Sequence, residues 1–131
     1  MHKSALALTV LGAGLLAGHA HANNACLLET KTTVMGVPLE VKDCIQNSGM
    51  SARDFQAQCN GMSQAVVSMG GPPAQITFLA ACPTPFQARC DVSGTARSIF
   101  YYYKREADTM DSLKMSCEQM MRGTYTRGTL R

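Results

Sequence analysis

Six cysteines constrain the possible folds of this chain more than any other feature. They are Cys26, Cys44, Cys59, Cys82, Cys90 and Cys117, and all three histidines of the chain precede them. An even number of cysteines in an exported chain indicates a framework of three disulfides. No C-x-x-C pair occurs, and no histidine lies among the cysteines, so the pattern does not fit a zinc knuckle or a thioredoxin-like redox site. We therefore expect a disulfide scaffold that holds no metal and no cofactor.

Residues 1–22 have the three-part layout of a secretory signal. A basic start at Lys3 precedes an apolar stretch over residues 5–17, and the segment ends in Ala20-His21-Ala22. This A-x-A ending predicts cleavage after Ala22. The apolar run is shorter than the roughly 20 residues of a membrane span, and glycines interrupt it, so we favour a signal over the alternative of an uncleaved anchor. We expect one mature domain, residues 23–131, that is periplasmic or secreted and has no membrane anchor.

The charge balance of residues 23–131 excludes some classes of partner. Eleven Lys and Arg residues stand against nine Asp and Glu residues, and the basic residues are spread along the chain. So small a net charge provides no electrostatic basis for nucleic-acid binding. No polybasic cluster indicates binding to a membrane surface. We expect another protein as the partner.

Periodicity and turn residues predict an α+β domain, in which an antiparallel sheet carries two packed helices. The sheet would consist of an N-terminal hairpin and central strands. The expected elements are a hairpin over 26–45, a helix from Ser51 to Gly70, a strand over 75–82, a hairpin over 87–103, a helix from Asp108 or Thr109 to Gly123, and a short strand over 124–126.

The two helices are each expected to bury one cysteine on an apolar face. The first face would consist of Phe55, Cys59, Met62, Val66 and Met69, and the second of Met110, Leu113, Cys117, Met120 and Met121. Methionine thioethers also bind Cu(I) in exported proteins. Because these methionines share the stripe of Leu113 and Cys117, core packing is the simpler explanation. Only Met115 is expected to point away.

The disulfide pairing depends on the register of the first hairpin. A three-residue loop at Val34–Gly36 would set Cys26 opposite Cys44, and this is the arrangement that we favour. A two-residue loop, Met35-Gly36, would instead place these cysteines on opposite faces, because a slip of one residue inverts every side chain. With the first loop, the expected pairs are Cys26–Cys44, Cys59–Cys82 and Cys90–Cys117.

The aromatic run at Phe100–Tyr103 is the best candidate for a contact surface. Strand alternation sends Tyr101 and Tyr103 to one face, beside basic residues, and Tyr and Arg are common at protein interfaces. The expected partner-binding residues are Arg97, Tyr101, Tyr103, Lys104 and Arg105. The alternative is a strand that is buried on both faces.

Catalysis has little support in the sequence. The mature chain has no histidine and no nucleophile motif, and helix capping accounts for the acids Glu106, Asp108 and Asp111. We therefore expect a non-catalytic exported module that binds another protein. A narrower form of this prediction is an inhibitor or immunity-type protein. One alternative is a small carboxylate-dependent hydrolase of envelope glycans, which needs two facing acids about 5–10 Å apart. Another is a structural component of envelope assembly.

Overall fold

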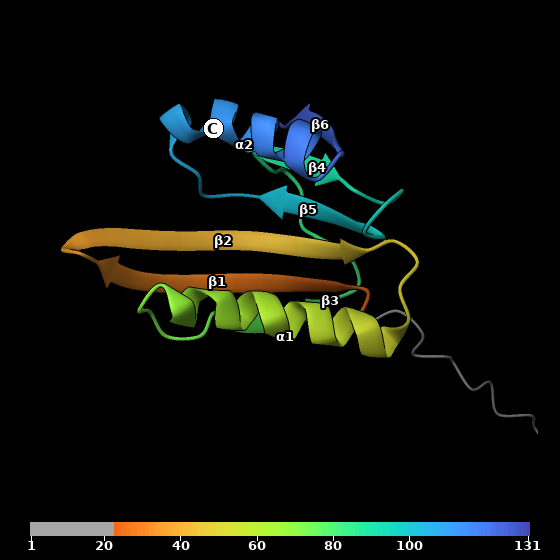
Figure 1. Ribbon diagram of the computed structural model, residues 1–131, viewed down its shortest axis with the longest axis horizontal. Coiled ribbons are helices and arrows are strands. Elements are labelled where there is room, and N and C mark those ends of the chain that lie inside the picture. Colours follow the sequence, from red (N-terminus) through yellow and green to blue (C-terminus); the bar gives the residue numbers. More distant parts are fainter. Residues whose placement is uncertain (1–22) are drawn as a thin grey trace, which may run out of the picture.

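The computed structural model describes residues 23–131, and the expected signal segment lies outside the described residues. Figure 1 shows the elements, which are β1 (Ala25–Val34), β2 (Val37–Asn47), α1 (Ala52–Ser68), β3 (Gln75–Leu79), β4 (Ala88–Asp91), β5 (Ser98–Tyr102), the 3₁₀ turn η1 (Ala107–Thr109), α2 (Met110–Met115), the π-helical turn η2 (Ser116–Met120) and β6 (Thr124–Arg127). The strands form one antiparallel sheet in the order β3-β1-β2-β5-β4-β6. These elements and three disulfides confirm the predicted disulfide-stapled α+β fold.

Both helices lie on the same face of the sheet, as the cross-strand register shows. One row across the sheet consists of Phe78, Cys26, Ile45, Phe100, Cys90 and Tyr125. Side chains in such a row point to one face. In this row, Cys26 is bonded to Cys59 of α1 and Cys90 to Cys117 of η2. We call this side the helix face; α1 covers its β1 end and α2 its β4 end (Figure 1).

The first hairpin has the two-residue loop, so the prediction of a three-residue loop was wrong. Val34 pairs with Val37 across Met35-Gly36, and Cys26 lies opposite Ile45 rather than Cys44. Met35 and Gly36 have φ values of 51° and 79°. Positive φ at both central positions is the type I′ geometry, whose twist matches that of the flanking strands. The single-residue difference in register sends Cys26 and Cys44 to opposite faces.

Two of the expected disulfide pairs are consequently wrong. Cys26 is joined to Cys59 and Cys44 to Cys82, while Cys90 and Cys117 form the remaining pair, which is also the pair that the sequence analysis chose. The pairs Cys26–Cys44 and Cys59–Cys82 cannot form here, because the sheet separates the members of the first pair. The structure instead provides one disulfide between the sheet and each of its three covering segments.

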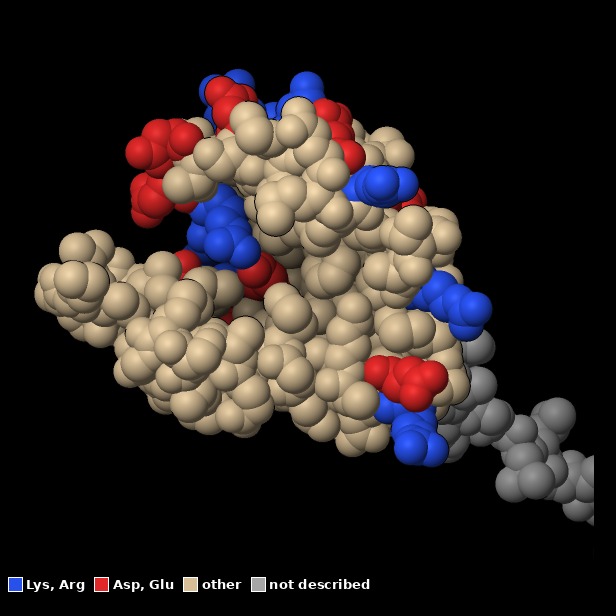
Figure 2. Space-filling view, viewed as in Figure 1, with Lys and Arg blue, Asp and Glu red and all other residues tan. Residues whose placement is uncertain are grey.

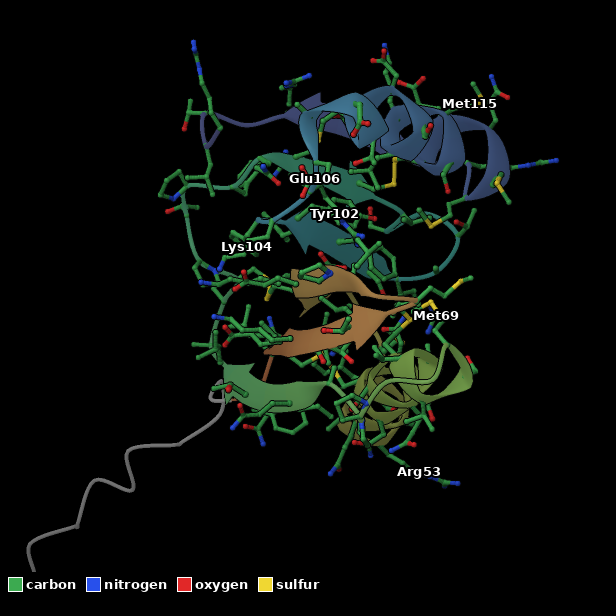
Figure 3. All side chains as sticks on the ribbon, turned by 90° about the vertical axis from the view of Figure 1, so that its left-hand side faces the viewer. Arg53, Met69, Tyr102, Lys104, Glu106 and Met115 are labelled. Atoms are coloured by element: carbon green, nitrogen blue, oxygen red, sulfur yellow. A yellow bond between two sulfur atoms is a disulfide. The ribbon has the colours of Figure 1, made fainter. Side chains whose placement is uncertain are left out.

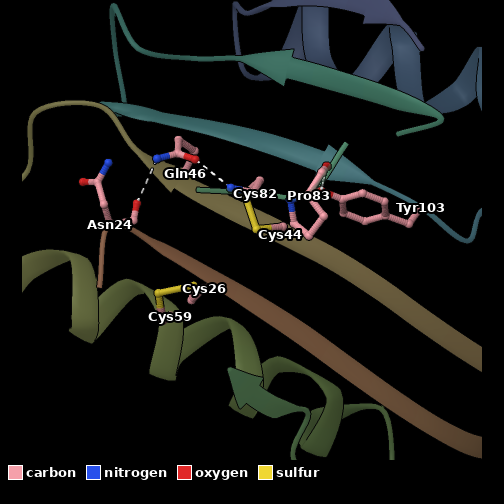
Figure 4. The surroundings of a disulfide bond; sticks show 8 residues. All are labelled: Asn24, Cys26, Cys44, Gln46, Cys59, Cys82, Pro83 and Tyr103. Atoms are coloured by element: carbon pink, nitrogen blue, oxygen red, sulfur yellow. Dashed lines mark hydrogen bonds between the residues drawn. A yellow bond between two sulfur atoms is a disulfide. The ribbon is translucent and has the colours of Figure 1, made fainter. Parts of the chain in front are cut away.

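The segment at residues 80–87, which we call the strap, covers the opposite face of the sheet (Figure 4). Its Cys82 is bonded to Cys44 of β2, and its backbone N–H donates to Oε1 of Gln46 at 2.9 Å. The hydroxyl of Tyr103 donates to the carbonyl of Pro83 at 2.7 Å. A small apolar cluster beneath the strap consists of Ala25, Leu27, Cys44, Cys82 and Tyr103. The sheet therefore has a core on each face.

Helix α1 begins and ends as its sequence predicts, but it buries a narrower face. The Ser51 side chain accepts from the Asp54 N–H at 3.1 Å, and the chain leaves the helix at Gly70, whose φ is 88°. The buried residues are Phe55, Cys59, Ser63 and Val66. The expected core positions Met62 and Met69 are exposed, because both lie on one flank of this stripe. Ser63 is buried instead, and its hydroxyl donates to the Ala74 carbonyl.

The second helical segment departs from regular α geometry, and this changes its buried face. Its last turn is π-helical, with the Met121 N–H bonded to the Ser116 carbonyl at 3.0 Å. A π turn contains an extra residue per turn. Consequently Met120, expected in the core, is 81% exposed, while Met110 and Cys117 are buried. Neither Asp108 nor Thr109 caps the segment through its side chain, because Thr109 donates to the Glu106 carbonyl instead.

Candidate functional site

The aromatic strand β5 is covered on both faces, which was the alternative to a contact surface. Tyr102 packs on the helix face, and Tyr103 lies under the strap with 6% of its surface exposed. Tyr101 is half-buried and contacts Phe86 of the strap edge-to-face, with ring centroids 5.1 Å apart. Burial raises the pKa of Tyr102 to about 12 and also raises the pKa of Tyr103. The tyrosine rings therefore stabilise the fold and offer little open surface.

The basic residues predicted at the contact surface lie at two separate places. Arg97 precedes β5, whereas Lys104 and Arg105 follow it. At about 3.3 Å per residue along a strand, roughly 20 Å separates Arg97 from Lys104. The five residues predicted from sequence thus do not form one patch. Lys104 and Arg105 instead meet the far end of the first hairpin, which the sequence analysis did not include in a site.

This far end of the hairpin is a two-stranded ribbon that extends beyond the rest of the sheet (Figure 1). We call residues 31–40 the free ribbon. On its outer sides, β1 pairs with β3 only over Ala25–Glu29, and β2 pairs with β5 only over Asp43–Asn47. Within residues 23–131, no strand pairs with the outer edges of the free ribbon. Two apolar side chains near its tip are highly exposed, Met35 at 98% and Val37 at 65%.

A cleft of about 1030 Å³ lies between the free ribbon and the segment 104–109. Figure 2 shows this hollow at the left of the molecule, with charged side chains in its wall. Figure 3 looks from the end of the ribbon, and it places Lys104 and Glu106 between the ribbon and α2. Apolar wall residues are Val37, Leu39 and Val41 of β2. The cleft thus combines an apolar strand surface with a charged rim.

The edge of β2 that borders the cleft has backbone groups without strand partners. The last bond between the strands runs from the Tyr103 N–H to the Lys42 carbonyl, at 3.1 Å. Alternate residues of an antiparallel strand direct their N–H and C=O groups to the same side. The N–H and C=O of Glu40 and the C=O of Pro38 therefore point toward the cleft. An extended chain in the cleft could form hydrogen bonds with these groups.

Two ion pairs join the segment after β5 to β2. Glu40 pairs with Lys104 and lies 3.4 Å from Nζ of Lys31. The hydrogen bond from Lys104 lowers the pKa of Glu40, so this carboxylate stays ionised. Deeper in the sheet, Arg105 pairs with Asp43, and its guanidinium lies 5.2 Å from the centroid of the Tyr102 ring. These contacts hold Lys104 and Arg105 in place beside the free ribbon.

Asp43 is the most perturbed carboxyl group of this region. Its side chain is largely buried, with 18% of its surface exposed, and Oδ1 has no hydrogen-bond partner. Desolvation raises the pKa of Asp43 to about 6 although Arg105 opposes the shift. The carboxylate of Asp43 forms its ion pair with Arg105, and Asp43 does not line the cleft.

The acidic residues of the cleft lie among basic ones. Glu40 and Glu106 are its acidic residues, and the lysines around Glu40 favour its charged form. A general acid would need a raised pKa. Within the described residues 23–131, no cluster of His, Cys, Asp and Glu could hold a metal ion. In the same part of the chain, no helix has the length and apolar character of a membrane span.

The sequence contained one signal that indicated the tip of the free ribbon beside this site, an apolar Met35 directly before Gly36. Met35 has a positive φ, a conformation that non-glycine residues seldom adopt, and its side chain contacts solvent almost completely. Asn or Asp is the usual residue before Gly in this turn. An apolar residue at a turn position that favours Asn breaks a local rule, and such positions tend to be functional.

Comparisons of the chain with protein-family models, with curated proteins and with solved structures each gave no significant match.

Proposed function

We propose that this protein is an exported protein-binding module that takes up an extended segment of a partner protein in the cleft beside β2. The observation that carries the proposal is an apolar, exposed ribbon whose strand edge is open along its cleft side. Edge strands of this kind add a further strand from a partner, since the free backbone groups provide hydrogen bonds in a fixed direction. Three disulfides are compatible with an extracellular or secreted protein, and the periplasm is the compartment we propose.

The two faces of the ribbon at β2 would contact different side chains of the partner strand. Val37, Leu39 and Val41 alternate with Pro38 and Glu40, so the former lie on one face of the ribbon and the latter on the other. A partner strand would set apolar side chains against the first face. On the other face, Glu40 and Lys104 would meet polar or charged side chains. Pro38 lacks an N–H, which limits the number of bonds near the tip.

The test uses extended peptides that are selected from a displayed library on the immobilised, oxidised protein. In NMR titrations, bound peptides are expected to shift the amide signals of Val37, of residues 39–42 and of residues 104–106, and to slow hydrogen exchange of the Glu40 amide. Val37→Asp should weaken binding by about 10-fold or more, because it places a charge in the apolar contact. Val67→Asp on α1 is the matched control, since Val67 is also exposed.

Peptides that map outside the cleft would contradict the proposal, and so would equal affinity of Val37→Asp and the unchanged protein. The inhibitor or immunity-type role is a narrower form of the same proposal. It requires that the partner be an enzyme and that its activity fall when the module binds.

A further inference from the structure

A second cavity, which we call the basic pocket, lies on the far side of the segment that contains Arg105. Its volume is about 850 Å³, and its wall includes Gln87, Arg105, Met110, Arg127, Leu130 and Arg131. This size is within the range of small-molecule sites, about 300–1,000 Å³. The residues come from the strap, from the segment before α2 and the start of α2, and from β6 and the chain after it, so only the tertiary structure brings them together. The end of the chain, marked C in Figure 1, lies beside α2.

The wall of the basic pocket has an excess of positive charge. Three arginines line it and no Asp or Glu side chain does, and the arginine charges exceed that of the α-carboxylate of Arg131, where the sequence ends. Arg105 is paired with Asp43, whereas Arg127 and Arg131 take part in no ion pair within residues 23–131. The cleft beside the ribbon is different, because Glu40 and Glu106 offset its basic residues. Of the two cavities, the basic pocket is the one whose charge favours an anion.

Gln87 fixes the two arginine-bearing walls relative to each other. Its amide Oε1 accepts from the Arg105 N–H at 2.7 Å, and its Nε2 donates to the Arg105 carbonyl at 3.2 Å. Its own carbonyl accepts from the Gly128 N–H at 2.7 Å. One residue of the strap thus joins both walls of the pocket through hydrogen bonds.

The part of the pocket wall that follows β6 is also fixed by backbone contacts. The Leu130 N–H donates to the Phe86 carbonyl at 3.1 Å, which continues the pairing of β6 beyond its end. A Cβ on Gly128 would lie 1.9 Å from the Phe86 carbonyl oxygen, so this close approach requires glycine. The backbone that carries Arg127 and Arg131 is therefore positioned before any ligand binds, which reduces the entropic cost of binding.

We propose that the basic pocket binds a small organic anion, a carboxylate or phosphate group attached to a compact apolar body. Arginine guanidinium groups bind both kinds of oxyanion through paired hydrogen bonds. Arg127 and Arg131 would contact the anionic group. Met110, which is buried, and Leu130 provide apolar surface for the rest of the ligand. Arg105 lines both cavities, but Arg127 and Arg131 line only the basic pocket, so loss of anion binding in Arg127→Ala can be distinguished from loss of peptide binding at the cleft.

The experiment titrates the full oxidised protein with inorganic phosphate, phenyl phosphate and benzoate at constant ionic strength, with NMR detection. Phenyl phosphate or benzoate is expected to saturate and to shift the amide signals of Gln87, Arg105 and Gly128. Inorganic phosphate should bind less tightly, because it lacks the apolar body. The comparison of phenyl phosphate with benzoate identifies the preferred oxyanion. Arg127→Ala should weaken binding by about 10-fold or more, the effect of one lost charge-assisted hydrogen bond.

Arg53→Ala is the matched control, because it removes the same charge from α1, far from the pocket (Figure 3). It should change the affinity by less than about 2-fold, since exposed charges beyond a Debye length are screened. Equal weakening by Arg53→Ala and Arg127→Ala would show a net-charge effect and overturn the proposal. Titrations that do not saturate, or shifts that map away from Gln87, would overturn it as well.

Discussion

The hairpin of β1 and β2 is one continuous pair of strands with two contrasting ends. Over Ala25–Leu28, β1 is buried, with β3 and β2 on its edges, α1 on one face and the strap on the other. In the free ribbon, the same two strands pair only with each other, and their side chains are half-buried or exposed. Both ends have the alternating side chains of a strand. Position in the fold, rather than strand pattern, thus decides whether a strand residue stabilises the core or is available for contact.

The difference separates stability from recognition. All three disulfides lie in the covered part of the molecule, and none reaches the free ribbon. Changes in the covered part should therefore lower the free energy of unfolding, and changes in the ribbon should leave it almost unchanged. The predictions below test this contrast in order of decreasing effect.

Removal of the strap disulfide should have the largest effect. The double substitution Cys44→Ala with Cys82→Ala opens a loop with a sequence separation of 38 residues. The chain-entropy model gives a loss of about 4 kcal/mol in the free energy of unfolding, and domains of this size have only about 5–15 kcal/mol. Urea denaturation measures the change. A loss below about 1 kcal/mol would show that the Tyr103 and Gln46 contacts hold the strap without the disulfide.

The second prediction concerns pH and Asp43 in the covered part of β2. The folded protein raises the pKa of Asp43 to about 6, above its value of about 4 in the unfolded chain. Protonated Asp43 therefore contributes to the free energy of unfolding fully below pH 4. This contribution is lost as the pH rises through 6, because the fold disfavours the ionised carboxylate. The free energy of unfolding should fall by about 3 kcal/mol over this window.

Asp43→Asn is the control for this titration, because it removes the proton-binding group but keeps the shape. Denaturation curves at pH 4.0, 5.0, 6.0 and 7.0 (about one unit apart, which brackets the expected pKa) compare the two proteins. The difference between their slopes isolates Asp43 from the other acids. Parallel pH profiles would contradict the raised pKa.

The third prediction compares two glycines that the structure treats differently. A Cβ on Gly123 would lie 2.7 Å from Sγ of Cys90 and 2.9 Å from the Asp91 carbonyl oxygen, whereas a Cβ on Gly61 would meet nothing within 4 Å. Gly123→Ala should therefore cost about 1–3 kcal/mol through overpacking. Gly61→Ala, in the exposed interior of α1, should stabilise by about 1 kcal/mol. Thermal unfolding of both variants checks the prediction, and equal midpoints would contradict it.

The smallest effect on stability is expected in the free ribbon. Met35→Asn should raise the free energy of unfolding by about 0.5 kcal/mol, because Asn-Gly suits the type I′ turn better than Met-Gly. The same substitution should weaken binding of the selected peptides, since it removes the exposed apolar side chain. If Met35→Asn lowers the free energy of unfolding and leaves peptide binding unchanged, the prediction is wrong, because the ribbon would then contribute to stability and not to binding.

The parts of the fold that depend on local chemistry could be predicted from sequence. Ser51 caps α1, Gly70 ends it, and the period-two alternation around Met35-Gly36 gives a hairpin. Gly123 was expected at the end of the second helix, but Arg122 is the residue with the positive φ there, and Gly123 is required by its close approach to the Cys90–Cys117 disulfide. The exposed Met62 and Met69 were missed, because hydrophobicity alone does not show which flank of a helix meets the sheet. Met120 was missed because the sequence pattern did not indicate the π turn.

For the candidate site, the sequence identified Lys104 and Arg105 but not their neighbours. The residues that accompany them, Val37, Leu39 and Glu40, are more than 60 positions away, and only the pairing of β2 with β5 brings them close. The same pairing covers Tyr101 and Tyr103, which the sequence had favoured. An aromatic strand has the same pattern whether a covering segment is present or absent.

The sequence by itself determined that this chain makes three disulfides, two helical segments and an antiparallel sheet, because cysteine number, caps, breakers and periodicity act locally. The tertiary structure decided which cysteines pair, which strand edge has no neighbouring strand and which arginines line the same pocket. Each of these depends on the register of the first hairpin and on contacts between distant segments. A shift of one residue leaves the local pattern unchanged but moves every side chain to the other face of the sheet.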